Sequence, residues 1–143
     1  MENKSFYIAN TPKNLPIFHQ PFYLEAVTGG QWDVCLVKSN DNSIVASLPY
    51  YKQKVKNYLN LTQPPLCQCL GPWINKEYLG NLKMTKYYSL VDELYSQLSE
   101  YDYYEHNWHY SLNNWLPLYW KGFEQTTYYT SVSYTHLTLP TKA

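Results

Sequence analysis

Two pairs of closely spaced residues carry side chains that can bind a metal or act as nucleophiles. One pair is Cys67 and Cys69, and the other is His106 and His109. Thiolate and imidazole are the usual zinc ligands, so zinc is the metal for which this sequence offers a ligand set. A Cys–His pair could also support nucleophilic catalysis, although the spacing selects no particular thiol. The competing interpretation is buried, reduced cysteines and histidines that bond to neighbouring backbone.

The elements expected around the histidines bear on this choice. Residues 103–108 are rich in aromatic side chains and predict a strand, which would place His106 and His109 on opposite faces. Residues 118–123, Leu-Tyr-Trp-Lys-Gly-Phe, predict a short helix closed by a left-handed glycine at Gly122. Residues 124–130 favour a further strand. Histidines on opposite faces of a strand could not both reach one zinc ion. The Cys-x-Cys spacing is also tighter than that of common zinc motifs, so both features argue against one shared zinc site.

The composition predicts one domain with an unusual aromatic content. The 143 residues suffice for one domain with its own core, but not for two. Lys+Arg and Asp+Glu number 11 each, which argues against a nucleic-acid or anionic-membrane partner. The sequence shows neither a membrane-length apolar run nor a secretory signal, so we expect a cytoplasmic protein with reduced thiols. The 17 Tyr and 5 Trp suit a cleft or an interface as well as a core.

A hairpin and an amphipathic helix are the clearest expected elements. Residues 31–38 and 43–54 flank an Asn-Asp-Asn turn and predict two antiparallel strands. From Met84 to Leu98 the apolar positions recur every three or four residues, which predicts a helix packed on the sheet. Other expected elements are a helix at 18–27 and strands at 58–62 and 6–9. Pro49 is expected either to end the regular pairing of its strand or to mark an edge of it. Together these elements predict an α/β fold: a mixed, largely antiparallel sheet with a few covering helices.

Four segments and one short pattern carry a family resemblance. The segments are PIFHQPFYLEAV, IVASLPYY, PPLCQCLGPWI and FEQTTYYT, and the pattern is Tyr-x-x-Gly-Phe at residues 119–123. They resemble the N-terminal half of FemAB-like proteins, which are bacterial N-acyltransferases of the GNAT fold. The resemblance covers roughly residues 16–130 and implies a partial GNAT-like domain at residues 1–130. It also implies that the complete protein transfers an acyl group, from acetyl-CoA or a related donor, to a small-molecule amine acceptor.

The resemblance further implies that acyl-CoA binding belongs to a missing C-terminal GNAT half. GNAT domains hold the CoA pyrophosphate on a glycine-containing loop at a helix N-terminus. Neither that loop nor a G-x-G-x-x-G or P-loop motif occurs in this sequence. This chain is therefore expected to bind no cofactor, to shape the acceptor cleft and to be inactive alone.

We expect four residues to line the acceptor cleft: Tyr50, Trp73, His109 and Asn113. Each lies at the end of a predicted strand or in the following loop, where side chains converge. His109 is the candidate catalytic base for the amine, because histidine titrates near neutral pH. A structural histidine that bonds a loop carbonyl is the alternative. Two other function classes stay open: an aromatic-lined module that binds a glycan or peptide without catalysis, and a metal-stabilised structural domain.

Residues 131–143 are expected to be a read-through tail and not part of the natural protein. Residues 132–141, VSYTHLTLPT, match letter for letter one reading frame of a transposon-type sequencing adapter. We therefore place the end of the genuine coding sequence near Thr130 and give His136 no role. The alternative is a genuine terminal strand, since residues 134–139 have fair strand propensity.

Overall fold

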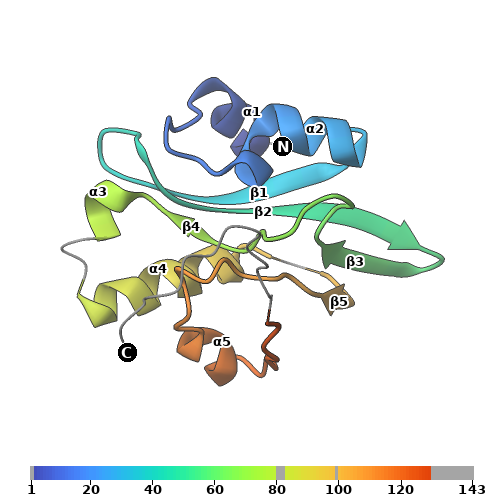
Figure 1. Cartoon of the computed structure of the whole chain (residues 1–143). Coiled ribbons are helices and arrows are strands. Elements are labelled where there is room, and N and C mark those ends of the chain that lie inside the picture. Colours follow the sequence, from blue (N-terminus) through green and yellow to red (C-terminus); the bar gives the residue numbers. More distant parts are fainter. Residues whose placement is uncertain (1, 80–82, 99, 130–143) are drawn as a thin grey trace, which may run out of the picture.

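The computed structural model describes residues 2–79, 83–98 and 100–129, and it arranges them in three layers. A β-sheet forms the middle layer, with α1 and α2 on one face and α4 and α5 on the other (Figure 1). The helical segments are α1 (Glu2–Ala9), the 3₁₀ turn η1 (Ile17–His19), α2 (Pro21–Thr28), α3 (Lys76–Leu79), α4 (Met84–Ser96) and α5 (Leu116–Trp120). The strands are β1 (Trp32–Lys38), β2 (Ile44–Val55), β3 (Tyr58–Thr62), β4 (Trp73–Ile74) and β5 (Tyr103–Tyr104). The expectation of a mixed, largely antiparallel α/β fold is confirmed.

The long strand β2 is the centre of the sheet. Its partners β1, β3 and β4 all run antiparallel to it, whereas β5 pairs with β3 in parallel. A parallel pair needs a crossover connection, and α4 lies in the chain between β3 and β5. The sheet therefore combines an antiparallel meander with one parallel crossover.

Pro49 lies inside β2 and does not end its pairing with β1, but on the other side of β2 it marks an unpaired position. It stands opposite Val34 of β1, and β2 continues to Val55. On the other side of β2, β4 pairs only with Ala46 and Ser47, and β3 pairs only from Tyr51 onward. Pro49 thus occupies the gap between two successive neighbours, where a missing amide hydrogen costs no ladder hydrogen bond.

Both faces of the sheet are buried, which explains why the strand residues of β1 are apolar on both sides. The cluster toward α1 and α2 takes the alternate residues Trp32, Val34 and Leu36. The cluster toward α4 and α5 takes Cys35 and Val37. This alternation was predicted from the period-2 pattern of residues 31–38. Burial of both faces requires helices on both sides of the sheet.

Three local expectations are wrong. Residues 6–9 belong to α1 and are not a strand, and residues 124–129 are exposed and outside any helix or strand. The strand expected at 103–108 has only two ladder residues, followed by an isolated parallel bridge between Leu70 and Trp108. In each case the aromatic residues that predicted a strand pack on other elements or face solvent. Their strand propensity therefore does not determine the backbone conformation.

The amphipathic face of α4 is rotated slightly from its expected position. Val91, Tyr95 and Leu98 are buried as expected, but Met84 is exposed. The buried face also includes Tyr87, Leu90 and Leu94. This face contributes much of the core beneath the sheet.

Gln97, just beyond α4, covers the outer edge of β1. Its side-chain amide donates to the Leu36 carbonyl at 2.8 Å, and its carbonyl accepts from the Leu36 amide at 3.2 Å. A side chain therefore makes the two hydrogen bonds that a neighbouring strand would make. Edge strands left open invite pairing with other chains, and this contact blunts that edge.

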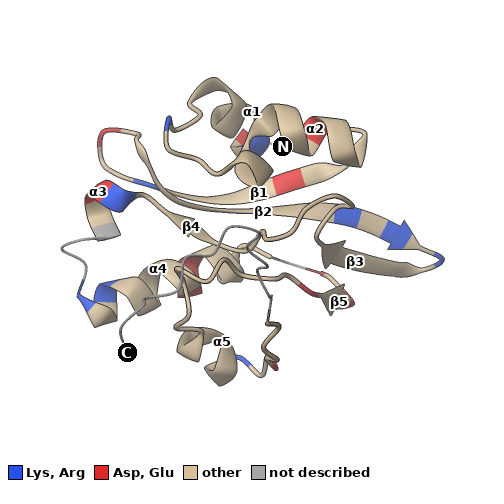
Figure 2. Cartoon of the chain, in the orientation of Figure 1, with Lys and Arg blue, Asp and Glu red and all other residues tan. Residues whose placement is uncertain are grey.

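Charge is concentrated away from α5. Figure 2 colours Lys residues blue along the outer half of β2 and at the tip of the β2–β3 hairpin, while the ribbon of α5 itself is tan. Among the described residues, none of the helices has the length and apolar character needed to cross a bilayer. The expected read-through tail, residues 131–143, lies outside the described residues.

Candidate functional site

The carboxyl ends of β3 and β5 place two loops side by side. Because the two strands are parallel, the chain leaves both at the same edge of the sheet. Residues 63–72 follow β3, and residues 106–116 lead from Glu105, just after β5, into the start of α5. In open α/β sheets, ligands bind in the region outside the carboxyl ends of parallel strands. The two loops are therefore the place to seek a site.

Side chains and backbone fasten these two loops to each other. The Asn107 amide donates to the Gln63 side-chain carbonyl, and the Leu70 amide donates to the Asn107 carbonyl at 2.8 Å. The Gln63 side-chain amide also donates to the Cys67 carbonyl at 3.0 Å. One glutamine thus closes its own loop and holds the neighbouring loop.

A hydrogen-bond chain of four side chains runs beneath the loops. The Trp108 indole Nε1 donates to the Tyr95 hydroxyl at 3.2 Å, and the Tyr95 and Tyr104 hydroxyls lie 2.6 Å apart. The Tyr104 hydroxyl lies 2.9 Å from Nδ1 of His106, whose Nε2 lies 3.0 Å from the Thr62 carbonyl.

The groups at the two ends fix the direction of this chain. A carbonyl only accepts, so the neutral His106 ring carries its proton on Nε2 and accepts at Nδ1. Tyr104 must then donate to Nδ1 and accept from Tyr95, which in turn accepts from the Trp108 indole. A charged His106 would donate to Tyr104 and reverse the chain, which would leave the Tyr95 proton without an acceptor within it.

The pKa values of the chain follow from its burial. Burial lowers the pKa of His106 to about 3, against an opposing contribution from the Thr62 carbonyl. Burial also raises the pKa of Tyr95 and the pKa of Tyr104 well above the ordinary value. All three side chains are therefore neutral near pH 7, in agreement with the direction derived from geometry. His106 is a structural residue that joins β5 to β3.

His109, the predicted base, is exposed on the loop after β5. Its Nδ1 accepts a hydrogen bond from the Ser111 amide at 3.1 Å and lies 2.8 Å from the Ser111 hydroxyl. A backbone amide only donates, so the neutral ring carries its proton on the other nitrogen, Nε2. In this conformation Nε2 is a hydrogen-bond donor. A base at Nε2 would first need the contact to Ser111 to break, so the assignment of His109 as a base stays a prediction.

The structure does not bring the four predicted cleft residues together. Trp73 is buried in the cluster beneath α1 and α2, whereas Tyr50 packs on the cluster toward α4. They therefore lie on opposite faces of the sheet. His109 and Asn113 share one exposed loop. Burial raises the pKa of Tyr50 above its ordinary value, so its phenol stays protonated.

A buried polar cluster that sequence reasoning missed lies under α1. The Tyr7 hydroxyl donates to the His19 carbonyl at 2.7 Å. Burial lowers the pKa of His19 to about 4, against a contribution from the nearby Leu70 carbonyl. Within the described part of the chain, Nδ1 of His19 and Oγ of Ser47 are buried without hydrogen-bond partners. The only sequence signal was a histidine inside an apolar segment, and nothing in its spacing marked it.

The cysteines and histidines do not converge on a metal. In residues 2–79, 83–98 and 100–129, no group of three or more His, Cys, Asp or Glu side chains has the geometry to hold an ion. Both ring nitrogens of His106 already have partners. Burial raises the pKa of Cys67 to about 11, which disfavours the thiolate that a metal or a nucleophilic reaction requires.

A shallow groove lies between α1 and α2, away from these loops in the fold. Its volume is about 570 Å³, and its lining combines apolar side chains with an ion pair. The ion pair joins Lys4 and Glu25 at 3.8 Å, and Lys4 also donates to the Gly30 carbonyl at 2.9 Å. These polar groups already satisfy one another, which leaves little for a ligand to bind.

Comparisons of this chain with protein-family models, with curated proteins and with solved structures gave no match.

Proposed function

We propose that this chain is the N-terminal part of a FemAB-like, GNAT-fold N-acyltransferase that transfers an acyl group to an amine. One observation supports the proposal: three of the four segments that resemble this family are far apart in the sequence but contact one another in the fold.

Three of the segments meet around the loop after β3. Tyr23, from PIFHQPFYLEAV, donates its hydroxyl to the carbonyl of Leu66 in PPLCQCLGPWI. Trp73, at the end of that second segment, pairs with Ser47 of IVASLPYY. The first of these contacts lies in the loop that follows the carboxyl end of β3, the edge at which ligands bind in open α/β sheets. The contact supports a role for this loop and for α2 in shaping the acceptor site.

The described residues do not fit the pyrophosphate of CoA. That group needs backbone amides at a helix N-terminus, usually after glycine. Of the described glycines, Gly29 and Gly30 follow the end of α2, Gly122 follows the end of α5, and Gly71 lies against Trp108. We derive no catalytic step through CoA and assign donor binding to the part of the protein that this chain lacks. The role left to this chain is to position the acceptor.

The experiment recovers the source gene by amplification across the codon for Thr130 and expresses the complete reading frame. Release of free CoA thiol is then measured with acetyl-CoA and a panel of amines. We expect amine-dependent thiol release by the complete protein and none by residues 1–130 alone. A complete protein that folds but releases no thiol with any acyl-CoA or amine would refute the proposal.

A non-catalytic binding module is the second candidate, and a surface of aromatic side chains favours it. Tyr119 and Trp120 of α5 are exposed, as are Tyr128 and Tyr129 in the segment that follows. Such side chains present large apolar faces with a polar handle, which suits a glycan or a peptide. Ligand binding by the isolated chain, together with no thiol release by the complete protein, would select this function.

A further inference from the structure

We infer that the acceptor is an amino sugar, a class of amine that is recognised through neutral groups. This inference rests on the proposed acyltransferase function, and it concerns the loops at the carboxyl ends of β3 and β5. Residues 63–72 and 106–116 contain no Asp, Glu, Lys or Arg. The chain has 22 such residues, 11 of each sign, so two adjacent loops without a carboxylate, an ammonium or a guanidinium group stand out.

The charged side chains that flank the second loop most closely on its C-terminal side and at its start have partners of their own. Glu105, just before His106, accepts a hydrogen bond from the Tyr103 hydroxyl. Lys121, beyond the second loop, pairs with Asp92 of α4 at 2.8 Å. An acceptor such as a lysine side chain would need a carboxylate to hold its ammonium group, and the loops provide none.

The loops instead offer amides and aromatic rings. Asn107, Ser111 and Asn113 are exposed, and each can donate and accept hydrogen bonds. Tyr110 is 86% exposed, and its ring lies 4.1 Å from the His109 ring, centroid to centroid. Sugar hydroxyls bond well to amides, and the C–H face of a sugar packs on an aromatic ring. The surface therefore combines the two kinds of contact that a sugar needs.

The chemistry of the amine agrees with the surroundings. The amine of an amino sugar is less basic than that of lysine, because neighbouring oxygen atoms withdraw electron density. More of it is neutral near pH 7, so it needs less help to lose a proton. His109 is the one titratable side chain exposed on the second loop besides Tyr110. A site without a carboxylate is better matched to the amine of an amino sugar, which is the weaker base, than to the amine of lysine.

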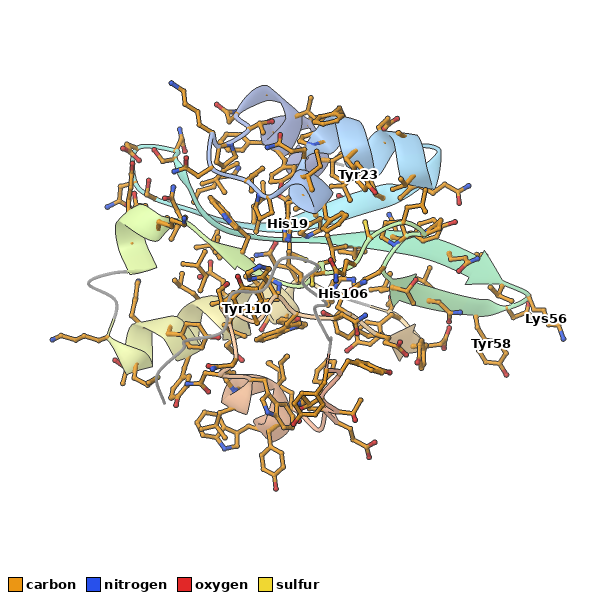
Figure 3. The ribbon with its side chains drawn as sticks, viewed as in Figure 1. His19, Tyr23, Lys56, Tyr58, His106 and Tyr110 are labelled. Atoms are coloured by element: carbon orange, nitrogen blue, oxygen red, sulfur yellow. The ribbon has the colours of Figure 1, made fainter. Side chains whose placement is uncertain are left out.

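The test titrates the complete 143-residue chain with D-glucosamine, followed by ¹⁵N-resolved chemical shifts. L-lysine amide is titrated in parallel as the charged amine. We expect saturable shifts for the residues of the second loop with glucosamine and none with lysine amide. Tyr110→Ala should weaken glucosamine binding about tenfold, the scale of one aromatic contact. The matched control is Tyr58→Ala. Tyr58 is 61% exposed at the β2–β3 hairpin, and Figure 3 shows it at the edge of the molecule while Tyr110 is near the middle of the view; its loss should not change glucosamine binding.

The outcomes separate this inference from the proposed function. If glucosamine gives no saturable shift, or if lysine amide binds as tightly, the amino-sugar assignment is overturned, even where the complete protein transfers acyl groups to another amine. If glucosamine binds in a Tyr110-dependent way but the complete protein releases no CoA thiol with it, the sugar site stands and the acyltransferase proposal fails.

Discussion

Replacing Gly71 by alanine tests how the loop after β3 packs on the loop after β5. Gly71 has a left-handed φ of +71°, and an added Cβ would lie 2.6 Å from Cδ1 of the Trp108 ring. The left-handed backbone costs an L-residue about 1–2 kcal/mol, and overpacking of this kind costs about 1–3 kcal/mol more. The ring cannot easily yield, because its Nε1 donates to Tyr95 and anchors the hydrogen-bond chain. We therefore expect Gly71→Ala to lower the free energy of unfolding by about 2–5 kcal/mol.

Gly29→Ala is the matched control for this prediction. Gly29 also has a left-handed φ, +62°, but an added Cβ there meets nothing within 4 Å. The backbone cost and the loss of unfolded-state freedom are shared by the two variants, so their difference isolates the overlap with the ring. Urea unfolding followed by circular dichroism gives both free energies. Equal losses for the two variants would refute the packing argument, as would an absence of coupling between Gly71→Ala and Trp108→Phe in a double-mutant cycle.

The remaining predictions concern stability and the sheet edge. Stability should fall as pH drops from about 6.5 toward 4, because unfolded His19 and His106 each bind a proton that their buried native rings do not. Each histidine contributes a loss of roughly 2 kcal/mol at about pH 5, so His19→Gln should roughly halve the dependence of the urea midpoint on pH. Tyr104→Phe removes the hydroxyl that bonds both Tyr95 and His106, and the free energy of unfolding should fall by about 1–3 kcal/mol for each unpaired partner. The control Tyr103→Phe should change the urea midpoint little, and equal effects of the two variants would contradict the hydrogen-bond chain. Gln97→Ala leaves the backbone amide and carbonyl of Leu36 without their side-chain partner, so light scattering should detect a concentration-dependent dimer. A variant that stays monomeric would show that other groups protect the edge of β1.

The elements that the sequence predicted well are those whose signals are local. The β1–β2 hairpin follows from alternation and an Asn-rich turn, and α4 follows from its apolar period. The end of α5 follows from Gly122, which has the expected positive φ of +91°. Each of these signals is contained within a few residues, so no knowledge of the rest of the fold was needed.

The candidate site was less predictable, because it depends on contacts across the sheet. Tyr50 was expected near a strand end but lies in the interior of β2, and it faces the opposite layer from Trp73 of β4. The role of His106 depends on the Thr62 carbonyl, 44 residues away in the sequence. Strand propensity also fails at residues 124–129, whose Thr and Tyr side chains are exposed and which form no strand. No local pattern carries such information.

The position of Pro49 divides one side of β2 into two separate units. Since the ladder to β4 ends before the proline and the ladder to β3 begins after it, the two ladders share no hydrogen bond along that side. Each can therefore break without the other, and the sheet need not unfold as a single cooperative body. Local opening of the part that carries β3 and β5 would leave β4 in place, because Trp73 and Ile74 are packed into the core clusters on the two faces of the sheet.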